Sequence, residues 1–153
     1  MSWIDGSEVR LVSSIATNSS QRQMLINLSN HPLSAWSDAQ RQTAQEEFGL
    51  LVDLPFPAVS ADATLQEVGQ KVEEYIPLCR GMFDDYFQTA GIADKTRNAI
   101  HIMGEFTFVY AFVNRCRELG LICVASTTER VVSNNPDNSK TTYFNFVQFR
   151  PYF

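Results

Sequence analysis

Residues 100–130 read IHIMGEFTFVYAFVNRCRELGLICVASTTER, and this stretch decides the fold. Two short apolar runs, Ala99–Met103 and Leu121–Ala125, have the composition of buried strands. Between them lies Phe106–Leu119, whose apolar residues recur at helical spacing after a Gly104-Glu105 joint. A strand, a helix and a second strand in this order predict a right-handed crossover between parallel strands of one sheet.

The preceding part of the chain repeats this alternation. Apolar runs at Gln23–Leu28 and Leu50–Leu54 predict two earlier strands. The predicted helices cover residues 38–48, 65–76 and 82–89, with a break at Pro77 and Gly81. Residues 129–133 and 141–150 predict a hairpin around an asparagine-rich turn. The expected fold class is α/β: a small Rossmann-like domain, with a mainly parallel sheet and a C-terminal antiparallel hairpin.

Composition limits the kinds of function. The chain has 153 residues, a net charge of −5, 44% hydrophobic residues and 19% charged residues, which is typical of one globular domain. Residues 1–23 are serine-rich and weakly patterned, so we predict an N-terminal extension before a domain over residues 24–153. Without a basic stripe the chain is not expected to bind long nucleic acid.

Cysteine content and hydropathy favour a cytoplasmic location. Cys79, Cys116 and Cys123 are odd in number and lack metal-ligand spacing, which indicates free thiols in a reducing compartment. Apolar runs stay well below the about 18 residues of a membrane span, so no membrane association is expected. The N-terminal residues do not have the apolar core of a secretory signal.

Polar residues follow three predicted strands at the points where these strands end. The three groups are Ser29-Asn30-His31, Gly104-Glu105-Phe106-Thr107 and Ser126-Thr127-Thr128-Glu129-Arg130. The carboxyl ends of parallel strands share one edge of a sheet, and ligands bind outside that edge. We therefore predict that these groups form one ligand site.

The residue types suggest which chemistry each group serves. The hydroxyls of Ser126–Thr128 and the cation of Arg130 suit a phosphate, although the same residues are typical of an ordinary turn. Gly104 would admit a close approach of ligand to a helix N-terminus. Glu105 suits a ribose hydroxyl, a base edge or an arginine; the alternative is that it only stabilises the helix dipole. A single glycine is not a dinucleotide fingerprint, so no such cofactor is expected.

The two histidines receive different interpretations. His31, in a turn before Pro32, is a candidate for proton transfer, and the alternative is an exposed or structural histidine. His101 lies between two isoleucines and is interpreted as a core or interface histidine. Neither has partners at ligand spacing, so no metal is expected. Arg150, at the end of the last strand, is a further candidate for ligand binding.

The central predicted helix is apolar nearly all round. Phe106, Val109, Tyr110, Val113 and Cys116 follow one helical face, whereas Phe108, Ala111 and Phe112 fill the other. A helix of this kind must be covered on two sides. Because a small domain has few elements to do so, we predict a homodimer.

Three stretches carry a resemblance to a known family. They are NLSNHPLSAW (residues 27–36), GEFTFVYAFVNRCRELGLICVASTTERVV (residues 104–132) and FNFVQFRPY (residues 144–152). In this order and at these distances they resemble the small Csx-type CRISPR-associated proteins of type III systems, which are similar to the CARF ligand-binding domain. The resemblance implies a homodimer that binds a cyclic oligoadenylate messenger, tetra- or hexa-adenylate, across its two-fold axis.

Several members of that group are ring nucleases, which cut the messenger and end an antiviral response. The implied reaction is metal-independent attack by the ribose 2′-hydroxyl on the adjacent phosphate, and orientation of this built-in nucleophile supplies much of the catalysis. Two alternatives remain: a non-catalytic binder of the messenger, or an unrelated nucleotide hydrolase. The expected catalytic residues are His31, Glu105 and Arg130. The expected ligand-binding residues are Ser29, Asn30, Gly104, Phe106, Thr107, Ser126, Thr127, Thr128 and Arg150.

Overall fold

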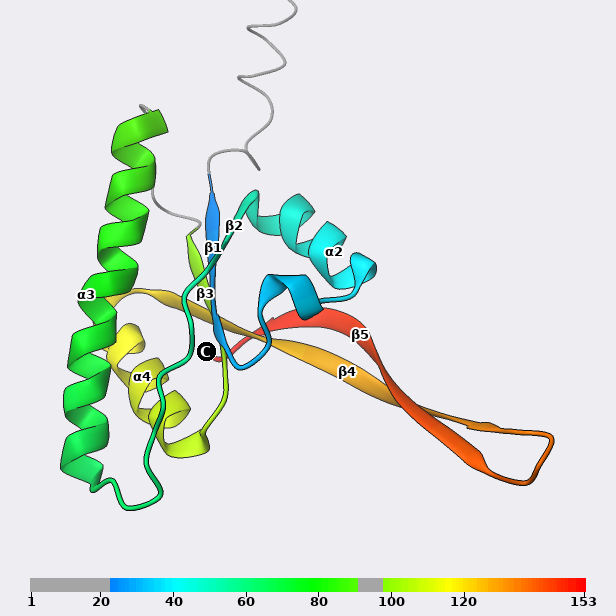
Figure 1. Cartoon of the computed structure of the whole chain (residues 1–153). Helices are drawn as coiled ribbons and strands as arrows, with labels where there is room; N and C mark the ends of the chain where they lie inside the picture. The colour runs from blue at the N-terminus through cyan, green and yellow to red at the C-terminus, as the bar shows by residue number, and fades with distance from the viewer. Residues whose placement is uncertain (1–22, 91–97) are drawn as a thin grey trace, which may run out of the picture.

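A five-stranded mixed sheet forms the centre of the protein in a computed structural model, which describes residues 23–90 and 98–153 (Figure 1). The strands are β1 (Met24–Ser29), β2 (Leu50–Asp53), β3 (Ala99–Met103), β4 (Ile122–Asn134) and β5 (Lys140–Pro151). Their order is β2-β1-β3-β4-β5, with β1 parallel to β2 and β3, β3 parallel to β4, and β5 antiparallel to β4. The predicted α/β class, with a mainly parallel sheet and a C-terminal hairpin, is confirmed.

Helices cover both faces of this sheet. They are α2 (Asp38–Phe48), α3 (Leu65–Ala90) and α4 (Phe106–Leu119), with a short 3-10 turn η2 (Leu33–Ala35) after β1. Helix α2 lies on one side of the sheet, and α3 and α4 lie side by side on the other (Figure 1). Ser37 caps α2 by accepting a hydrogen bond from the Gln40 N–H at 3.1 Å. The bounds of α4 agree with the predicted helix.

Helix α3 contradicts one prediction. The sequence predicted a break at Pro77 and Gly81, but α3 continues through both. The residues that hold it are spaced for one buried face; they are Val68, Val72, Ile76, Cys79 and Phe83. A proline inside a helix costs about 3 kcal/mol, whereas burying a large apolar side chain contributes about 1.5–3 kcal/mol. Packing of this face therefore outweighs the proline.

The strands alternate between two cores. Ile26 and Ile100 face α3 and α4, and belong to the larger apolar cluster. Leu25 and Ala99 point to the opposite side, where Trp36 and α2 complete a smaller cluster. Polar residues interrupt only the second side, at Asn27 and His101, which are both buried. The α2 side of the sheet therefore carries the polar groups of the interior.

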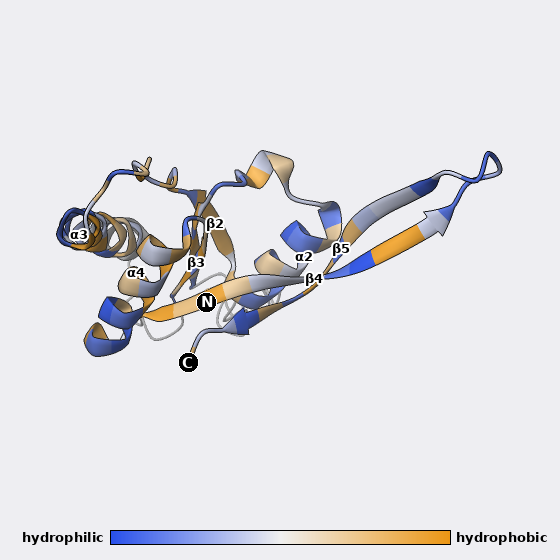
Figure 2. Cartoon of the chain, turned by 90° about the horizontal axis from the view of Figure 1, so that it is seen from below, coloured by the Kyte–Doolittle hydropathy of each residue, from blue (hydrophilic) through white to orange (hydrophobic). Residues whose placement is uncertain are grey.

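Strand β4 contradicts a second prediction. The sequence predicted a turn at Ser126–Thr128, but the strand runs without interruption to Asn134 and has only a bulge between Thr127 and Thr128. Serine and threonine favour turns, yet threonine is also a good strand former once a partner strand is present. Beyond the bulge, β4 and β5 leave the helices as a two-stranded ribbon (Figure 2). Residues 128–146 are called the arm, and the remainder of the described chain the body.

One prediction lies outside the described residues: the N-terminal extension at residues 1–23, apart from its last residue. Within residues 23–90 and 98–153, no helix has the length and apolarity needed to cross a membrane.

Candidate functional site

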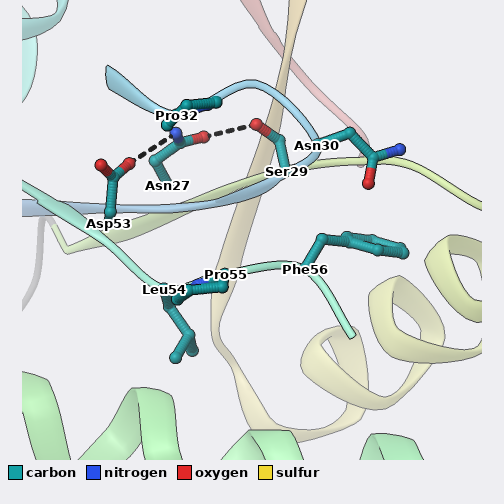
Figure 3. Close-up of a pocket in the computed structure, with 8 residues that line it drawn as sticks. All are labelled: Asn27, Ser29, Asn30, Pro32, Asp53, Leu54, Pro55 and Phe56. Atoms are coloured by element: carbon teal, nitrogen blue, oxygen red, sulfur yellow. Dashed lines mark hydrogen bonds between the residues drawn. The ribbon is translucent and has the colours of Figure 1, made fainter. Parts of the chain in front are cut away.

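A pocket opens at the carboxyl edge of the sheet, between the ends of β1 and β2. Open α/β sheets bind ligands outside the carboxyl ends of their strands. From β1 the chain moves to β2 on one side and then crosses to β3 on the other, so the switch point of the sheet lies between β1 and β3, on the other side of β1 from the pocket. The pocket has a volume of about 340 Å³ (Figure 3). Its lining residues are Asn27, Ser29, Asn30, Pro32, Asp53, Leu54, Pro55 and Phe56.

Asp53 and Asn27 form the polar wall of this pocket. The Asn27 side-chain amide donates to an Asp53 carboxylate oxygen at 2.9 Å (Figure 3). The Leu33 N–H donates to the same carboxylate, at 3.1 and 3.3 Å from its two oxygens. Asp53, at the end of β2, therefore anchors the chain that follows β1. Its carboxylate also gives this wall a negative charge.

The loop after β1 is fixed through the main chain of His31. Its carbonyl accepts hydrogen bonds from the Asn27 amide at 2.8 Å and the Trp36 indole at 3.0 Å. Its N–H donates to the Ser29 hydroxyl at 3.2 Å, and that hydroxyl donates to the Asn27 carbonyl oxygen at 2.7 Å. The residue is exposed, however. His31 therefore presents its imidazole to solvent from a rigid backbone position beside the pocket.

A chain of side-chain hydrogen bonds crosses the four parallel strands. Starting from α2, Gln40 donates to the Ser126 hydroxyl at 2.9 Å, and Ser126 lies 2.7 Å from His101 Nε2. His101 Nδ1 lies 2.9 Å from the Asn27 carbonyl oxygen, and Asn27 continues the chain to Asp53. These five residues are called the polar ladder. Within the described part of the chain, no buried side-chain nitrogen or oxygen lacks a hydrogen-bond partner.

The ladder fixes the tautomer of His101. The Asn27 amide nitrogen donates to Asp53, so its oxygen faces His101 and can only accept. His101 therefore carries its proton on Nδ1, and Nε2 accepts from the Ser126 hydroxyl. Burial lowers the pKa of His101 to about 4, and the nearby His31 contributes to the same shift. The imidazole is accordingly neutral near pH 7.

Hydroxyl, imidazole and amide in this order resemble the arrangement of an activated serine nucleophile. Two features argue against that role. A base with a pKa of about 4 is a poor acceptor for a serine proton, and Gln40 occupies a lone pair of the Ser126 oxygen. The ladder is better explained as the structure that holds the strands and the pocket wall together. His101, interpreted as a core or interface histidine, is indeed buried, with 2% of its surface exposed.

Gly104 permits a close approach to its backbone, but the group that approaches is the Phe56 ring and not a ligand. A Cβ atom at this position would lie 2.5 Å from two ring atoms of Phe56. Phe56 also packs edge-on against Phe108 and lines the pocket. The space that we expected a ligand to use at Gly104 is therefore taken by Phe56, which itself becomes a wall for a ligand.

Glu105 caps α4. Its carboxylate accepts from the main-chain N–H groups of Thr107 at 3.1 Å and Phe108 at 2.8 Å, and from the Thr107 hydroxyl at 2.7 Å. The Thr107 hydroxyl and these main-chain bonds lower the pKa of Glu105. This is the helix-stabilising alternative considered above, and it occupies the first N–H groups that an anion would need.

Ser126, Thr127, Thr128 and Arg130 do not form a cradle, because they lie on a strand. Ser126 belongs to the ladder, whereas the Thr127 hydroxyl donates to the Gln148 carbonyl at 3.2 Å. Arg130 is exposed on the arm, about 13 Å along the strand from Ser126 at 3.3 Å per residue. Arg150 is exposed on β5, opposite Ala125. The structure therefore does not bring these four residues together at one place.

Of the expected site residues, only Ser29 and Asn30 line the pocket, with His31 at its side. Sequence reasoning missed Asn27, Asp53 and the connection of His101 to both. A usable signal exists: each is a polar residue within an otherwise apolar strand, and buried polar groups need partners. No group of His, Cys, Asp and Glu side chains suited to a metal occurs among the described residues.

The fold and this pocket define a class of protein: a Rossmann-like α/β domain with a pocket of polar and apolar residues at the carboxyl edge of its parallel strands. The family model described as "Uncharacterized protein MJ1673 family" matches residues 23–150, so the chain belongs to that family. No curated protein and no solved structure matches the chain.

Proposed function

We propose that this protein binds a cyclic oligoadenylate, with one nucleoside unit of the ring in the pocket between the ends of β1 and β2. The observation that carries the proposal is the position of this pocket, at the sheet edge where Rossmann-like folds bind ligands. Its rim is the Ser29–His31 loop, which lies in one of the stretches that resemble the Csx-type proteins.

The pocket's chemistry suits a nucleoside better than a phosphate. Oxygen and amide groups of Asp53, Asn27 and Asn30 can bond ribose hydroxyls or a base edge. Phe56 and Pro55 provide apolar surface for a base. The carboxylate of Asp53 would repel a phosphate at the same place. With about 340 Å³, the pocket accommodates one unit and leaves the rest of the ring outside.

Calorimetric titration with cyclic tetra-adenylate and cyclic hexa-adenylate tests binding. Asn30→Ala removes a polar group from the pocket, and its affinity should fall about tenfold, the equivalent of about 1.4 kcal/mol. Asn145→Ala is the matched control, because Asn145 is an exposed asparagine on the arm. The proposal fails if neither ring binds, or if both variants bind like the parent. An unrelated nucleotide hydrolase would then be the better candidate.

A second candidate function is cleavage of the bound ring. The observation in its favour is His31, an exposed histidine on a backbone fixed by three hydrogen bonds beside the pocket. In this reaction the ribose 2′-hydroxyl attacks the adjacent phosphorus, the bond to the 5′-oxygen breaks, and that oxygen takes up a proton. His31 would supply this proton or accept the one from the hydroxyl.

Incubation of the protein with each ring in the presence of a chelator separates cleavage from binding. Cleavage should give linear adenylates that end in a 2′,3′-cyclic phosphate, detected by chromatography and mass. His31→Ala should slow product formation about 10²–10⁴-fold, the usual contribution of a general acid or base, while affinity stays the same. Binding without product would identify a protein that only sequesters the messenger.

We also propose a cytoplasmic location. Cys79, Cys116 and Cys123 are free and buried, and burial raises the pKa of the Cys79 thiol to about 12. Free buried thiols are typical of proteins in a reducing compartment. Fractionation of cells that express the protein tests this location.

A further inference from the structure

Helix α4 carries an exposed face that the body does not cover. Phe106 and Tyr110 are 87% and 73% exposed, although Phe108 and Phe112 on the same helix are fully buried. These two aromatic residues, together with Val113 and Arg117, form a line along the helix that we call the α4 seam. Tyr152 and Phe153 lie beside it, and the groove between them has a volume of about 490 Å³. Exposed apolar surface of this kind is typical of an interaction site.

The spacing of the seam residues reads the same in both directions. Positions 106, 110, 113 and 117 are separated by four, three and four residues, which is the spacing that aligns residues on one side of paired helices. Such a symmetric spacing suits two helices related by a two-fold axis, because an isologous contact uses the same patch on both copies. Two antiparallel copies of α4 would place Tyr110 opposite Val113 of the second copy, and Phe106 opposite its Arg117.

Charge favours this antiparallel direction. Glu105 is the N-cap of α4, and Arg117 lies in its last turn. Antiparallel pairing brings Glu105 of each copy near Arg117 of the other, and places the N-terminal end of each helix dipole beside the C-terminal end of the other. Glu118 also lies in this last turn, but its charge is already paired with Arg115 of its own chain at 3.0 Å. Parallel pairing would instead bring the two glutamates together at one end and the two arginines at the other. Arg117 already stacks on Phe153, 5.3 Å from the ring centre, so its guanidinium lies over the groove.

We propose that the α4 seam binds the α4 seam of a second copy of this chain, antiparallel and about a two-fold axis. The inference does not depend on the proposed function. The inference does affect how the proposed ligand would bind, because α4 has 14 residues and a length of about 21 Å. Each helix begins at the sheet edge that carries the pocket, so the two pockets lie at opposite ends of the seam. Each chain then binds its own ligand, in contrast to the shared site that the Csx resemblance implies.

Sedimentation of the full chain without ligand tests the interface. At micromolar concentration the mass should be twice the 17.3 kDa of one chain. Tyr110→Glu places a carboxylate in each half of the seam, so the dissociation constant should rise about a hundredfold or more. Tyr110 is largely exposed, and circular dichroism should show an unchanged fold. The matched control is Phe144→Glu, since Phe144 is an aromatic residue of the arm that is 66% exposed.

Disulfide trapping tests the direction of the pair. The cysteines of the described chain are buried, so introduced surface cysteines are the reactive ones. A mixture of Tyr110→Cys and Val113→Cys proteins should cross-link to each other faster than either cross-links to itself. Faster self-linking of each variant would indicate parallel helices and overturn the proposal. A monomeric parent, a dimer insensitive to Tyr110→Glu, or a dimer lost in Phe144→Glu instead would each overturn it as well.

Discussion

Strand β4 passes through two very different regions, the body and the arm. In the body, Cys123 and Val124 are buried, and β4 lies between β3 and β5. In the arm, Glu129 and Arg130 are exposed, although they still pair with β5. Pairing with β5 continues through both regions, but only in the body does β4 also pair with β3 and receive cover from helices. The comparison teaches that a further strand and helix packing together separate the body from the ribbon, since an isolated two-stranded ribbon is at best marginally stable.

The largest expected difference between the body and the arm is the loss of stability when an aromatic side chain is replaced by alanine. Phe112→Ala removes a fully buried ring of the body and should lower the free energy of unfolding by about 3–5 kcal/mol. Phe144→Ala removes a largely exposed ring of the arm and should stay within about 0.5 kcal/mol of the parent. Urea denaturation measures both. A large loss for Phe144→Ala would mean that the arm is packed in solution.

Acid should affect the body through His101. Its pKa is about 4 in the folded protein and about 6.5 in an unfolded chain, so between these values only the unfolded state takes up the proton. Stability should therefore fall as pH decreases from 6.5 towards 4, by up to about 3 kcal/mol for this group. His101→Gln is the control, because it cannot titrate. Equal pH dependence of parent and variant would contradict the assigned burial.

A smaller effect is expected where Phe56 lies on Gly104. Gly104→Ala should destabilise the body by about 1–3 kcal/mol, because the new methyl group displaces the Phe56 ring. Ligand affinity should change too, since that ring lines the pocket. Gly69→Ala has open space and lies within α3, so it should stabilise by about 0.5–1 kcal/mol. Thermal unfolding distinguishes the two; equal shifts would contradict the contact at Gly104.

The smallest effect should come from Arg130→Ala. This side chain is exposed on the arm, so the free energy of unfolding should change by no more than about 0.5 kcal/mol. Affinity for cyclic oligoadenylate should stay within about twofold of the parent, because Arg130 does not line the pocket. A tenfold loss in calorimetry would show that the arm contacts the ligand and would bring the two regions together functionally.

Local signals made most of the fold predictable, but not the continuity of β4 and of α3. The bounds of α4 follow from the polar joint at Gly104-Glu105 and from Gly120, which adopts the left-handed conformation of a helix end. Ser126–Thr128 suit a turn and a strand equally, and only the presence of β5 decides between them. The break predicted at Pro77 is wrong for a similar reason, because tertiary packing of α3 outweighs the low helix propensity of proline.

The sequence predicted which edge of the sheet carries the candidate site, but not most of the residues that form it. The rule for parallel strands placed Ser29 and Asn30 at the carboxyl edge of the sheet, where both line the pocket. The polar ladder was not predictable, because its bonds join residues far apart in sequence: His101 to Asn27, and Gln40 to Ser126. Hydroxyls and amides of this kind occur in many sequences, and only the register of the strands brings them together.

The register of β1 against β3 also has a consequence for the time course of folding. The Met24 N–H donates to the Asn98 side chain at 3.0 Å, which joins positions 74 residues apart. Arm residues such as Ser133 and Thr141 pair across a few residues. A hairpin closes in about 1–10 μs, whereas contacts between distant segments slow folding. We therefore expect the strands of the arm to pair early in refolding. Pairing of β1 with β3 should be slower, and the pocket should form only after it.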